Sequence, residues 1–417
     1  TDGRDTLSFS NVAAGEVWLC SGQSNMAFEL KGADTFSREG LDDPMLRFYD
    51  MKSHLKTWGL VWSEEDAGKV AQGKYYDRTR WSCSSEKTAG KFSAVGYYFG
   101  KMLRDSLNVP VGLICNAVGG TTTESFISRS ALEKVLPGFC DGWLEDESVM
   151  EWARGRAREN MSAFKGGYIQ HPFMPAYLFE NGIRPLERFQ VKGAIWYQGE
   201  SNVENIPQHE ILFRTLVDCW RQTWKNPDLP FYFVQLSSIE RPTWPEFRNS
   251  QRLLSLEIPH CGMAVSSDLG HPTDVHPRAK KPVGERLARL ALRNDYGKQV
   301  ECLAPAATKA ILNDSGNVTV LFDSPISVPG TMPVRGFRIC LEDGSEIPAS
   351  AEISGSDAVI LSRDAGRPNA AADSKNTKAD NRTAIVTVKY AWDPWTDANL
   401  TGTTGLPVST FDIEIGE

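Results

Sequence analysis

Five short apolar runs, separated by segments with helical periodicity, constrain the fold of this chain more than any other feature. Continuous apolar runs of this length are typical of strands that are covered on both faces of a sheet. Between the first two runs, Val95, Phe99 and Met102 recur at helical spacing. Alternation of strand and helix predicts an α/β fold with a doubly wound parallel sheet. The five runs cover residues 17–19, 111–115, 191–197, 231–236 and 262–265.

Four of these runs lead into polar or glycine-rich loops. In doubly wound sheets, ligands bind at the carboxyl ends of the strands, where such loops meet. We therefore expect four groups of side chains to converge at that edge. They are Ser24, Gly119 with Gly120, Gln198 with Glu200, and Asp274 with His276.

The length of 417 residues predicts two domains, because one ordinary core does not grow so large. Residues 15–302 are expected to form the larger α/β domain. After Leu303, short β-type runs between Asn, Asp, Gly and Pro clusters predict a smaller β-sandwich over 303–417. Residues 1–14 include the alternating LSFSNV and form a candidate strand for pairing with this β region.

Two polar stretches are predicted to be loops. The first runs from the end of the first strand to Lys91 and is expected to consist of excursions over the surface. A loop of this length is more often functional than idle. The second, residues 364–382, is low in apolar residues, and we expect it to be mobile.

The composition argues against two classes of partner. Lys plus Arg is 45 against 53 Asp plus Glu, so the net charge of −8 lacks the basic surplus that binds nucleic acid. No apolar stretch approaches the roughly 20 residues that span a bilayer. The eight cysteines are scattered without a C-x-x-C pair, which disfavours zinc-ribbon and redox motifs. Cys83 and Cys140 lie in loop-like sequence and are the candidates for a disulfide.

Ser24 is the candidate nucleophile, at the point where the first strand breaks into the turn SGQSN. A nucleophilic serine needs a rigid strand, a sharp bend and nearby backbone N–H groups that stabilise an oxyanion. The alternative is an ordinary turn serine, which is common in G-x-S sequences.

A serine nucleophile needs a histidine base that is oriented by a carboxylate. Asp274 and His276 provide both groups from one loop, and residues two apart in an extended segment face the same way. Asp268 and His271 are rivals in the same loop. A surface turn is the alternative interpretation of the D-x-H pattern.

Donors to an oxyanion are expected from the second and third loops. Gly119 and Gly120 form either a tight turn or a place where a backbone N–H approaches the reacting oxygen. Gln198 offers an amide donor, or it caps its loop. Glu200 is, in order of preference, an anchor behind the site, a rival carboxylate for His276, or an exposed charge.

Four ordered motifs closely resemble the sialate O-acetylesterase family, the acetylesterase branch of SGNH-type serine hydrolases. The resemblance runs from about Asn11 to Leu292 and continues more weakly beyond it. The motifs are VWLCSGQSNM, NAVGGTTTESFIS, IWYQGESN and SDLG…TDVHP…KKPVGERLA.

This resemblance implies a flavodoxin-like catalytic domain without a metal or other cofactor. It implies a triad of Ser24, His276 and Asp274 and an oxyanion hole from the Ser24 N–H, Gly120 and Gln198. Thr273 stands where the wider SGNH pattern has its acid, which shifts the role to Asp274. The QGES run replaces the usual third-motif Asn, and the large β domain that usually precedes GEVWLC is almost absent.

The substrate expected from the resemblance is an O-acetylated sugar, with sialic acid acetylated at its glycerol side chain ahead of acetylated xylan or another plant glycan. A sialate carboxylate favours an arginine at the site, and Arg241 and Arg78 are the candidates. Gln23 and Asn25 are expected to support binding or the surrounding shell. A carbohydrate-binding protein without activity is the other class of function. We expect an extracytoplasmic location, periplasmic or secreted, although the chain shows no signal peptide.

Overall fold

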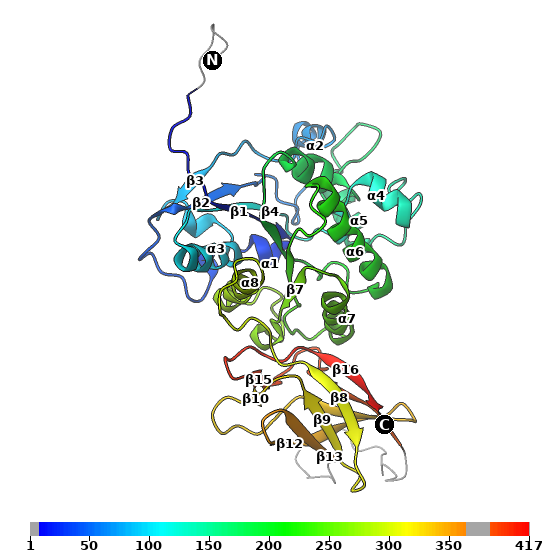
Figure 1. Ribbon diagram of the computed structural model, residues 1–417. Coiled ribbons are helices and arrows are strands. Elements are labelled where there is room, and N and C mark those ends of the chain that lie inside the picture. Colours follow the sequence, from blue (N-terminus) through cyan, green and yellow to red (C-terminus); the bar gives the residue numbers. More distant parts are fainter. Residues whose placement is uncertain (1–7, 364–383, 417) are drawn as a thin grey trace. The chain divides into compact units, whose positions relative to one another are not determined.

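The computed structural model describes residues 8–363 and 384–416. The chain forms two compact units, and each is built from several segments. Unit 1 comprises Thr1–Gln198, Thr215–Phe231 and Lys280–Ala288. Unit 2 comprises Gly199–Arg214, Tyr232–Ala279 and Arg289–Glu417. Figure 1 shows the helices and strands along the chain.

A seven-stranded sheet has the order β3-β2-β4-β1-β5-β6-β7. Strand β1 is parallel to β4 on one side and to β5 on the other, and β2 is parallel to β4. Only the short β3 is antiparallel among the pairs described in unit 1. The predicted α/β class with parallel strands is therefore confirmed. The strands are β1 Glu16–Gly22, β2 Asp43–Asp50, β3 Ser82–Ser84, β4 Val111–Ala117, β5 Gly193–Tyr197, β6 Phe231–Val234 and β7 Cys261–Ala264.

Helices cover both faces of this sheet. Trp18 of β1 packs edge-on against Phe99 of α3, while Trp196 of β5 packs against Trp220 of α6. Because Trp196 pairs in register with Ser21, it lies on the face opposite to Trp18. The helices are α1 Ser24–Ala27, α2 Glu64–Val70, α3 Ala94–Leu107, α4 Arg129–Val135, α5 Glu151–Asn160, α6 Ile206–Thr223, α7 Trp244–Glu257 and α8 Lys280–Asn294.

Helix α3 illustrates how local sequence sets these elements. The Ser93 side chain accepts the Gly96 N–H and caps the helix start, and Asn108 ends the helix in the left-handed region at φ 54°. Gly284 of α8 lies against Val95 and Phe99, where an added Cβ would come within 3.0 Å of the α3 backbone. The two helices therefore pack closely, side by side in Figure 1.

The stretch from the first strand to Lys91 is more ordered than predicted. It contains strand β2, helix α2 and strand β3. The sequence DPMLRFYD of β2 mixes Pro, Arg and Asp with apolar residues, yet Leu46 and Phe48 are buried. The loop prediction is therefore wrong for this part, because pairing with β4 compensates for a weak local pattern.

The β-rich region is a closed barrel rather than the predicted sandwich. Its strand order is β11-β12-β13-β9-β8-β16-β14, and a separate pair is formed by β10 and β15. Val320, Ile339 and Val388 belong to its buried core. The strands are β8 Ala307–Leu312, β9 Val318–Phe322, β10 Ile326–Ser327, β11 Phe337–Leu341, β12 Glu346–Ser354, β13 Ala358–Arg363, β14 Ile385–Tyr390, β15 Thr401–Gly402 and β16 Phe411–Gly416.

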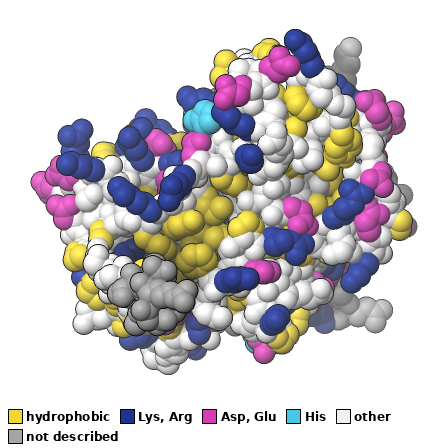
Figure 2. All heavy atoms as spheres, turned by 90° about the horizontal axis from the view of Figure 1, so that it is seen from above, with side chains coloured by type: hydrophobic (Ala, Val, Ile, Leu, Met, Phe, Trp, Pro, Cys, Tyr) yellow, Lys and Arg dark blue, Asp and Glu magenta, His cyan; other side chains and the backbone are white. Residues whose placement is uncertain are grey.

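Some of the other predictions concern residues that lie partly outside the described ranges. Residues 8–14 form no strand, while residues 1–7 and the predicted mobile loop at 364–382 lie outside the described ranges. All eight cysteines are described, and each is a free thiol, so Cys83 and Cys140 are not bonded. In the described ranges, no helix is long and apolar enough to cross a membrane. Figure 2 shows basic and acidic side chains interspersed over the visible face.

Candidate active site

The turn that carries Ser24 is fastened to the strands on both sides of β1. The Gln23 N–H donates to the Tyr197 carbonyl at 3.0 Å, and the Val118 N–H donates to the Gly22 carbonyl at 3.0 Å. Gly22 has φ +134°, and a Cβ there would lie 2.1 Å from the Tyr197 oxygen. Only glycine allows the chain to bend this close to β5.

Ser24 is the first residue of α1 and is half-buried between two buried neighbours, Gln23 and Asn25. The N–H groups of Met26 and Ala27 both donate to the Gln23 carbonyl, which closes the turn. Among the described residues, Gln23 Oε1 is a buried acceptor without a hydrogen-bond partner. The turn therefore presents one partly accessible hydroxyl from a rigid backbone.

Gly119 lies directly beside Ser24. A Cβ at Gly119 would lie 3.5 Å from the Ser24 Cβ. The Thr57 hydroxyl donates to the Gly119 carbonyl at 3.2 Å and so fixes this peptide. The structure thus brings the first and second predicted loops together.

Gly120 has a packing reason to be glycine. Its φ is +81°, and a Cβ would lie 2.6 Å from the Trp152 ring and 3.0 Å from Phe173. Trp152 also packs edge-on against the exposed Trp58, with centroids 6.2 Å apart, and Arg156 lies over the rings of both tryptophans. This aromatic and basic cluster was not predicted, since Trp58 is far in the sequence from Trp152 and Arg156.

Gln198 follows β5 and ties the third loop to the second. Its Oε1 accepts the Thr123 hydroxyl at 2.7 Å, and its Nε2 donates to the Thr121 carbonyl at 3.3 Å. The side chain is 1% exposed, so it is held in one orientation. Glu200, which belongs to unit 2, is also buried, at 9% exposed.

Lys280 is a buried cation that sequence reasoning missed. Its ammonium donates to Asn25 Oδ1 and lies over the rings of Phe28, at 4.9 Å, and Tyr197, at 5.4 Å. Lys280 and Asn25 are both 0% exposed. Lys280 therefore fixes the residue that follows Ser24, and only the KKPVGERLA motif hinted at its importance.

Asp274 and His276 form a local turn in unit 2. The His276 N–H donates to Asp274 Oδ1 at 2.8 Å, while the same oxygen lies 4.0 Å from His276 Nδ1. The side chains are 54% and 37% exposed, respectively. The carboxylate therefore lies next to the imidazole, at more than hydrogen-bond distance. Ser24 belongs to unit 1.

The rival residues of this loop have other surroundings. His271 Nδ1 accepts the N–H groups of Thr273 and Asp274 at 3.2 and 3.1 Å, so it caps the turn that contains Asp274. Asp268 lies at the 3₁₀ turn Ser267–Leu269 and lines a separate pocket in unit 2.

The remaining histidines divide into buried and exposed groups. Burial lowers the pKa of both His171 and His209 to about 3, so each is neutral. His54 is exposed and pairs through Nδ1 with Asp77 at 2.7 Å, which raises the pKa of His54. This His54–Asp77 pair is tighter than the pair of Asp274 and His276.

Neither predicted carboxylate-binding arginine is buried. Arg241 is exposed and lies over the Trp244 ring at 5.3 Å, and Arg78 is exposed in the segment that follows Tyr75 and Tyr76. Among the described residues, no group of three or more His, Cys, Asp or Glu is arranged to hold a metal ion.

Comparisons with known proteins point to one family. Residues 151–293 match the family described as carbohydrate esterase, sialic acid-specific acetylesterase. The chain is 28% identical to the sialate O-acetylesterase of Mus musculus, over 94% of this chain and 74% of the mouse protein. It is also 28% identical to that of Rattus norvegicus, over 70% of this chain and 59% of the rat protein.

A solved structure points to the same group of carbohydrate esterases. The crystal structure of a carbohydrate acetylesterase from Xanthomonas citri aligns with this chain at 31% sequence identity and a TM-score of 0.73. The alignment covers 96% of this chain and 80% of the Xanthomonas chain. The similarity therefore extends over the described α/β sheet and the barrel.

Proposed function

Because the chain belongs to the sialate O-acetylesterase family of carbohydrate esterases, we propose that it removes O-acetyl groups from sugars with Ser24 as the nucleophile. The observation that carries this proposal is the rigid turn at Ser24, which hydrogen bonds to Tyr197 and Val118 hold in place. A nucleophile of this kind gains from a fixed backbone, because little reorganisation is then needed to reach the transition state. An inactive binding protein is not favoured, since the chain is a member of an esterase family.

The proposed reaction has two steps. Ser24 Oγ attacks the acetyl carbonyl carbon while His276 takes its proton, and the sugar oxygen then leaves with that proton. Water next attacks the acetyl-enzyme, His276 again takes a proton, and acetate leaves as Ser24 recovers its hydrogen. Asp274 orients His276 and stabilises the imidazolium.

The oxyanion hole is proposed to use the N–H of Ser24 together with donors from the second and third loops. The resemblance to the family implies the role of the Ser24 N–H. Gly120 and Gln198 were assigned from the family resemblance. Gly119 joins them as a candidate because it lies against the Ser24 Cβ.

Finer structural assignments belong to the same proposal. We assign the seven-stranded sheet and its helices to the flavodoxin-like SGNH class. Residues 15–302 are then the catalytic domain, and residues 303–417 are the accessory domain. Glu200 is proposed as an anchor behind the site, because it is buried. Gln23 Oε1 is proposed to accept a hydrogen bond from a substrate hydroxyl. We also propose that the protein acts outside the cytoplasm.

The preferred substrate is sialic acid that carries an acetyl ester on its glycerol side chain. The support for this choice is the similarity to sialate O-acetylesterases. Arg241, which lies over the Trp244 ring, stays the candidate for the sialate carboxylate. Acetylated xylan is the alternative, with support from the carbohydrate acetylesterase of Xanthomonas citri.

A rate comparison tests the proposal. The enzyme is supplied in parallel with 9-O-acetylated sialic acid and with acetylated xylo-oligosaccharide, and released acetate is measured. We expect acetate from at least one sugar, with a higher kcat/KM for the sialate. A large preference for the xylan would contradict the sialate assignment, and no acetate from either sugar would contradict carbohydrate O-acetylesterase activity.

A further inference from the structure

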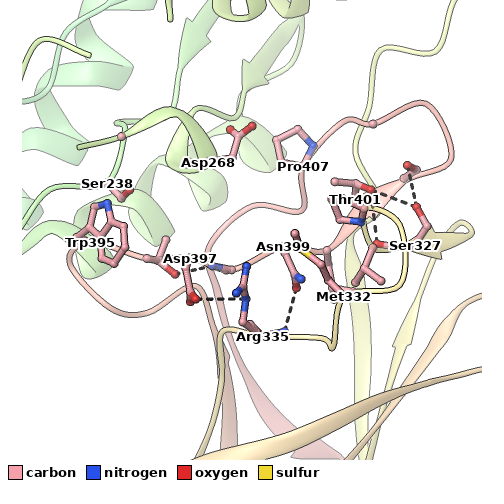
Figure 3. Close-up of a pocket in the computed structure, with 18 of the residues that line it drawn as sticks. Ser238, Asp268, Ser327, Met332, Arg335, Trp395, Asp397, Asn399, Thr401 and Pro407 are labelled. Atoms are coloured by element: carbon pink, nitrogen blue, oxygen red, sulfur yellow. Dashed lines mark hydrogen bonds and ion pairs between the residues drawn. The ribbon is translucent and has the colours of Figure 1, made fainter. Parts of the chain in front are cut away.

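Unit 2 contains a pocket of about 670 Å³ that the proposed mechanism does not use. One wall comes from Ser238, Asp268 and Gly270, and the others come from the segments around Ser327 and 395–407. Figure 3 shows the labelled side chains arranged around this space. A pocket of this volume is in the range that binds small molecules.

The wall that carries Trp395 is held rigidly by Arg248 of α7. The Arg248 guanidinium donates to the carbonyls of Ala391, Asp393 and Pro394 at 2.7 to 2.9 Å. Arg248 is 0% exposed, and its Nε also donates to Thr410 at 2.9 Å. Trp395 therefore extends from a backbone that is fixed before any ligand binds.

A second wall includes the loop that leads to Asp274 and His276. The His271 N–H donates to the Ser238 carbonyl at 3.1 Å, and the Ile239 N–H donates to the Pro394 carbonyl at 3.0 Å. A Cβ at Gly270 would lie 2.1 Å from the Ser238 oxygen, so the two segments are in close contact. The segment at Ser238 therefore supports both the pocket and the loop that carries Asp274 and His276.

The polar lining is dense and has little net charge. Arg335 Nε pairs with Asp397 Oδ2 at 3.2 Å, and the Arg335 N–H donates to Asn399 Oδ1 at 2.9 Å. The Ser327 and Thr401 hydroxyls lie 3.1 Å apart. Arg335, Asp397 and Asp268 are the ionisable residues of the lining, so one positive charge faces two negative charges.

This lining fits a neutral sugar better than an acidic one. Hydroxyl groups bind well to mixed donors and acceptors, and the apolar face of a pyranose packs on an aromatic ring such as Trp395, which is 38% exposed. A carboxylate would meet an arginine that already has a counter-ion and a second aspartate nearby. The balance of charge therefore disfavours sialic acid itself in this pocket.

We propose that this pocket binds a neutral pyranose of the glycan that carries the acetyl ester, as a docking subsite separate from the ester-cleaving residues. The inference rests on the proposed carbohydrate substrate. On a sialoglycan, the bound unit is the neutral sugar to which sialic acid is attached, and on a plant glycan it is a unit of the backbone.

The test measures binding of lactose, xylotriose and free N-acetylneuraminic acid to the full chain by calorimetric titration. We expect lactose or xylotriose to bind, and Trp395→Ala to weaken that binding by about tenfold. Trp395→Phe should retain most of it, and Leu312→Ala, an exposed apolar truncation on the barrel, should retain all of it. Binding of free sialic acid should not depend on Trp395.

A second variant guards against misfolding. Thr403 is exposed on the lining, so Thr403→Trp adds bulk without removing buried contacts and should block the neutral sugar. Absence of binding by both neutral sugars, or unchanged binding in Trp395→Ala and Thr403→Trp, would overturn the inference. Both variants should still hydrolyse 4-nitrophenyl acetate, so this failure differs from failure of the Ser24 mechanism.

Discussion

The turn at Ser24 and the loop at Asp274 and His276 carry the proposed chemistry, yet they are held in opposite ways. The Ser24 turn is bound to the backbone of β4 and β5, and its neighbour Gln23 is 4% exposed. In the other loop, the Asp274 and His276 side chains are 54% and 37% exposed. Asp274 Oδ1 accepts the His276 N–H, and the Asp274 N–H donates to His271 Nδ1.

The difference concerns how each proposed catalytic group is positioned within its own unit. The nucleophile is positioned by tertiary hydrogen bonds that form with the sheet. The imidazole and carboxylate are 4.0 Å apart, and catalytic hydrogen bonds of this kind often tighten only when substrate binds. Removal of the Ser24 hydroxyl should act on chemistry alone, whereas substitutions of Asp274 and His276 should reveal how that pair is aligned.

The largest effect is expected at Ser24. Ser24→Ala removes the nucleophile and should lower kcat on 4-nitrophenyl acetate by roughly three to six orders of magnitude, because only binding and oxyanion stabilisation remain. Ser21→Ala is the matched control, since the buried Ser21 hydroxyl donates to the Asn116 carbonyl at 2.6 Å. Near-normal rates in Ser24→Ala with collapse in Ser21→Ala would reverse the assignment.

A comparison of two histidines tests the base. His276→Ala should lower kcat by roughly as much as loss of the nucleophile, because the two residues act as a unit. His54→Ala should have little effect, although His54 pairs with Asp77 at only 2.7 Å. Rates of both variants on the same ester decide the matter, and a larger loss in His54→Ala would transfer the role of base to unit 1.

The carboxylate of the second region gives the next smaller effect. Asp274→Asn should lower kcat far more than it raises KM, since Asp274 acts on the tautomer and charge of His276 rather than on substrate binding. Glu200→Gln is the comparison, because Glu200 is the rival carboxylate and is buried. A mild loss in Asp274→Asn beside a severe one in Glu200→Gln would assign the orienting role to Glu200.

The smallest effect concerns stability, and it depends on the buried His171. Burial lowers the pKa of His171 to about 3, below its unfolded value near 6.5. The stabilisation is therefore complete above pH 6.5 and is lost as the pH falls toward 3. Between pH 7.5 and 5.5, His171 should contribute a loss of about 1.4 kcal/mol to the free energy of unfolding.

Urea unfolding at the two pH values measures this contribution. The pH-dependent loss should shrink by about that amount in His171→Asn. An equal pH dependence in the wild type and in His171→Asn would show that His171 does not stay neutral on folding.

The sequence predicted the parts of the fold that have a strong local pattern. The apolar runs at Val111 and Phe231 became β4 and β6, and the periodic stretch after Ser93 became α3. Strand β2 was missed because its Pro, Arg and Asp hide its buried residues, and pairing with β4 is a tertiary effect. Closure of the barrel depends on long-range pairing, which alternation of residues does not encode.

The candidate site was predictable to a similar extent. Motif order predicted Ser24, Gly120, Gln198 and the D-x-H loop, and the structure brings Gly119, which precedes Gly120, beside Ser24. The contact of Lys280 with Asn25 joins residues at opposite ends of the α/β region, so spacing gave no signal for it. The sequence also did not predict that Trp395 lines a pocket, because its loop is held by Arg248, which is distant in the sequence.

The most direct test of the central claim is covalent labelling of the nucleophile. The protein is treated with diethyl 4-nitrophenyl phosphate, which phosphorylates activated serines, and the modified peptide is identified by mass spectrometry. The account predicts one diethyl phosphate on Ser24, with labelling abolished in Ser24→Ala and slowed strongly in His276→Ala. A label on Ser21 or another residue, or inactivation of the enzyme without modification of Ser24, would contradict it.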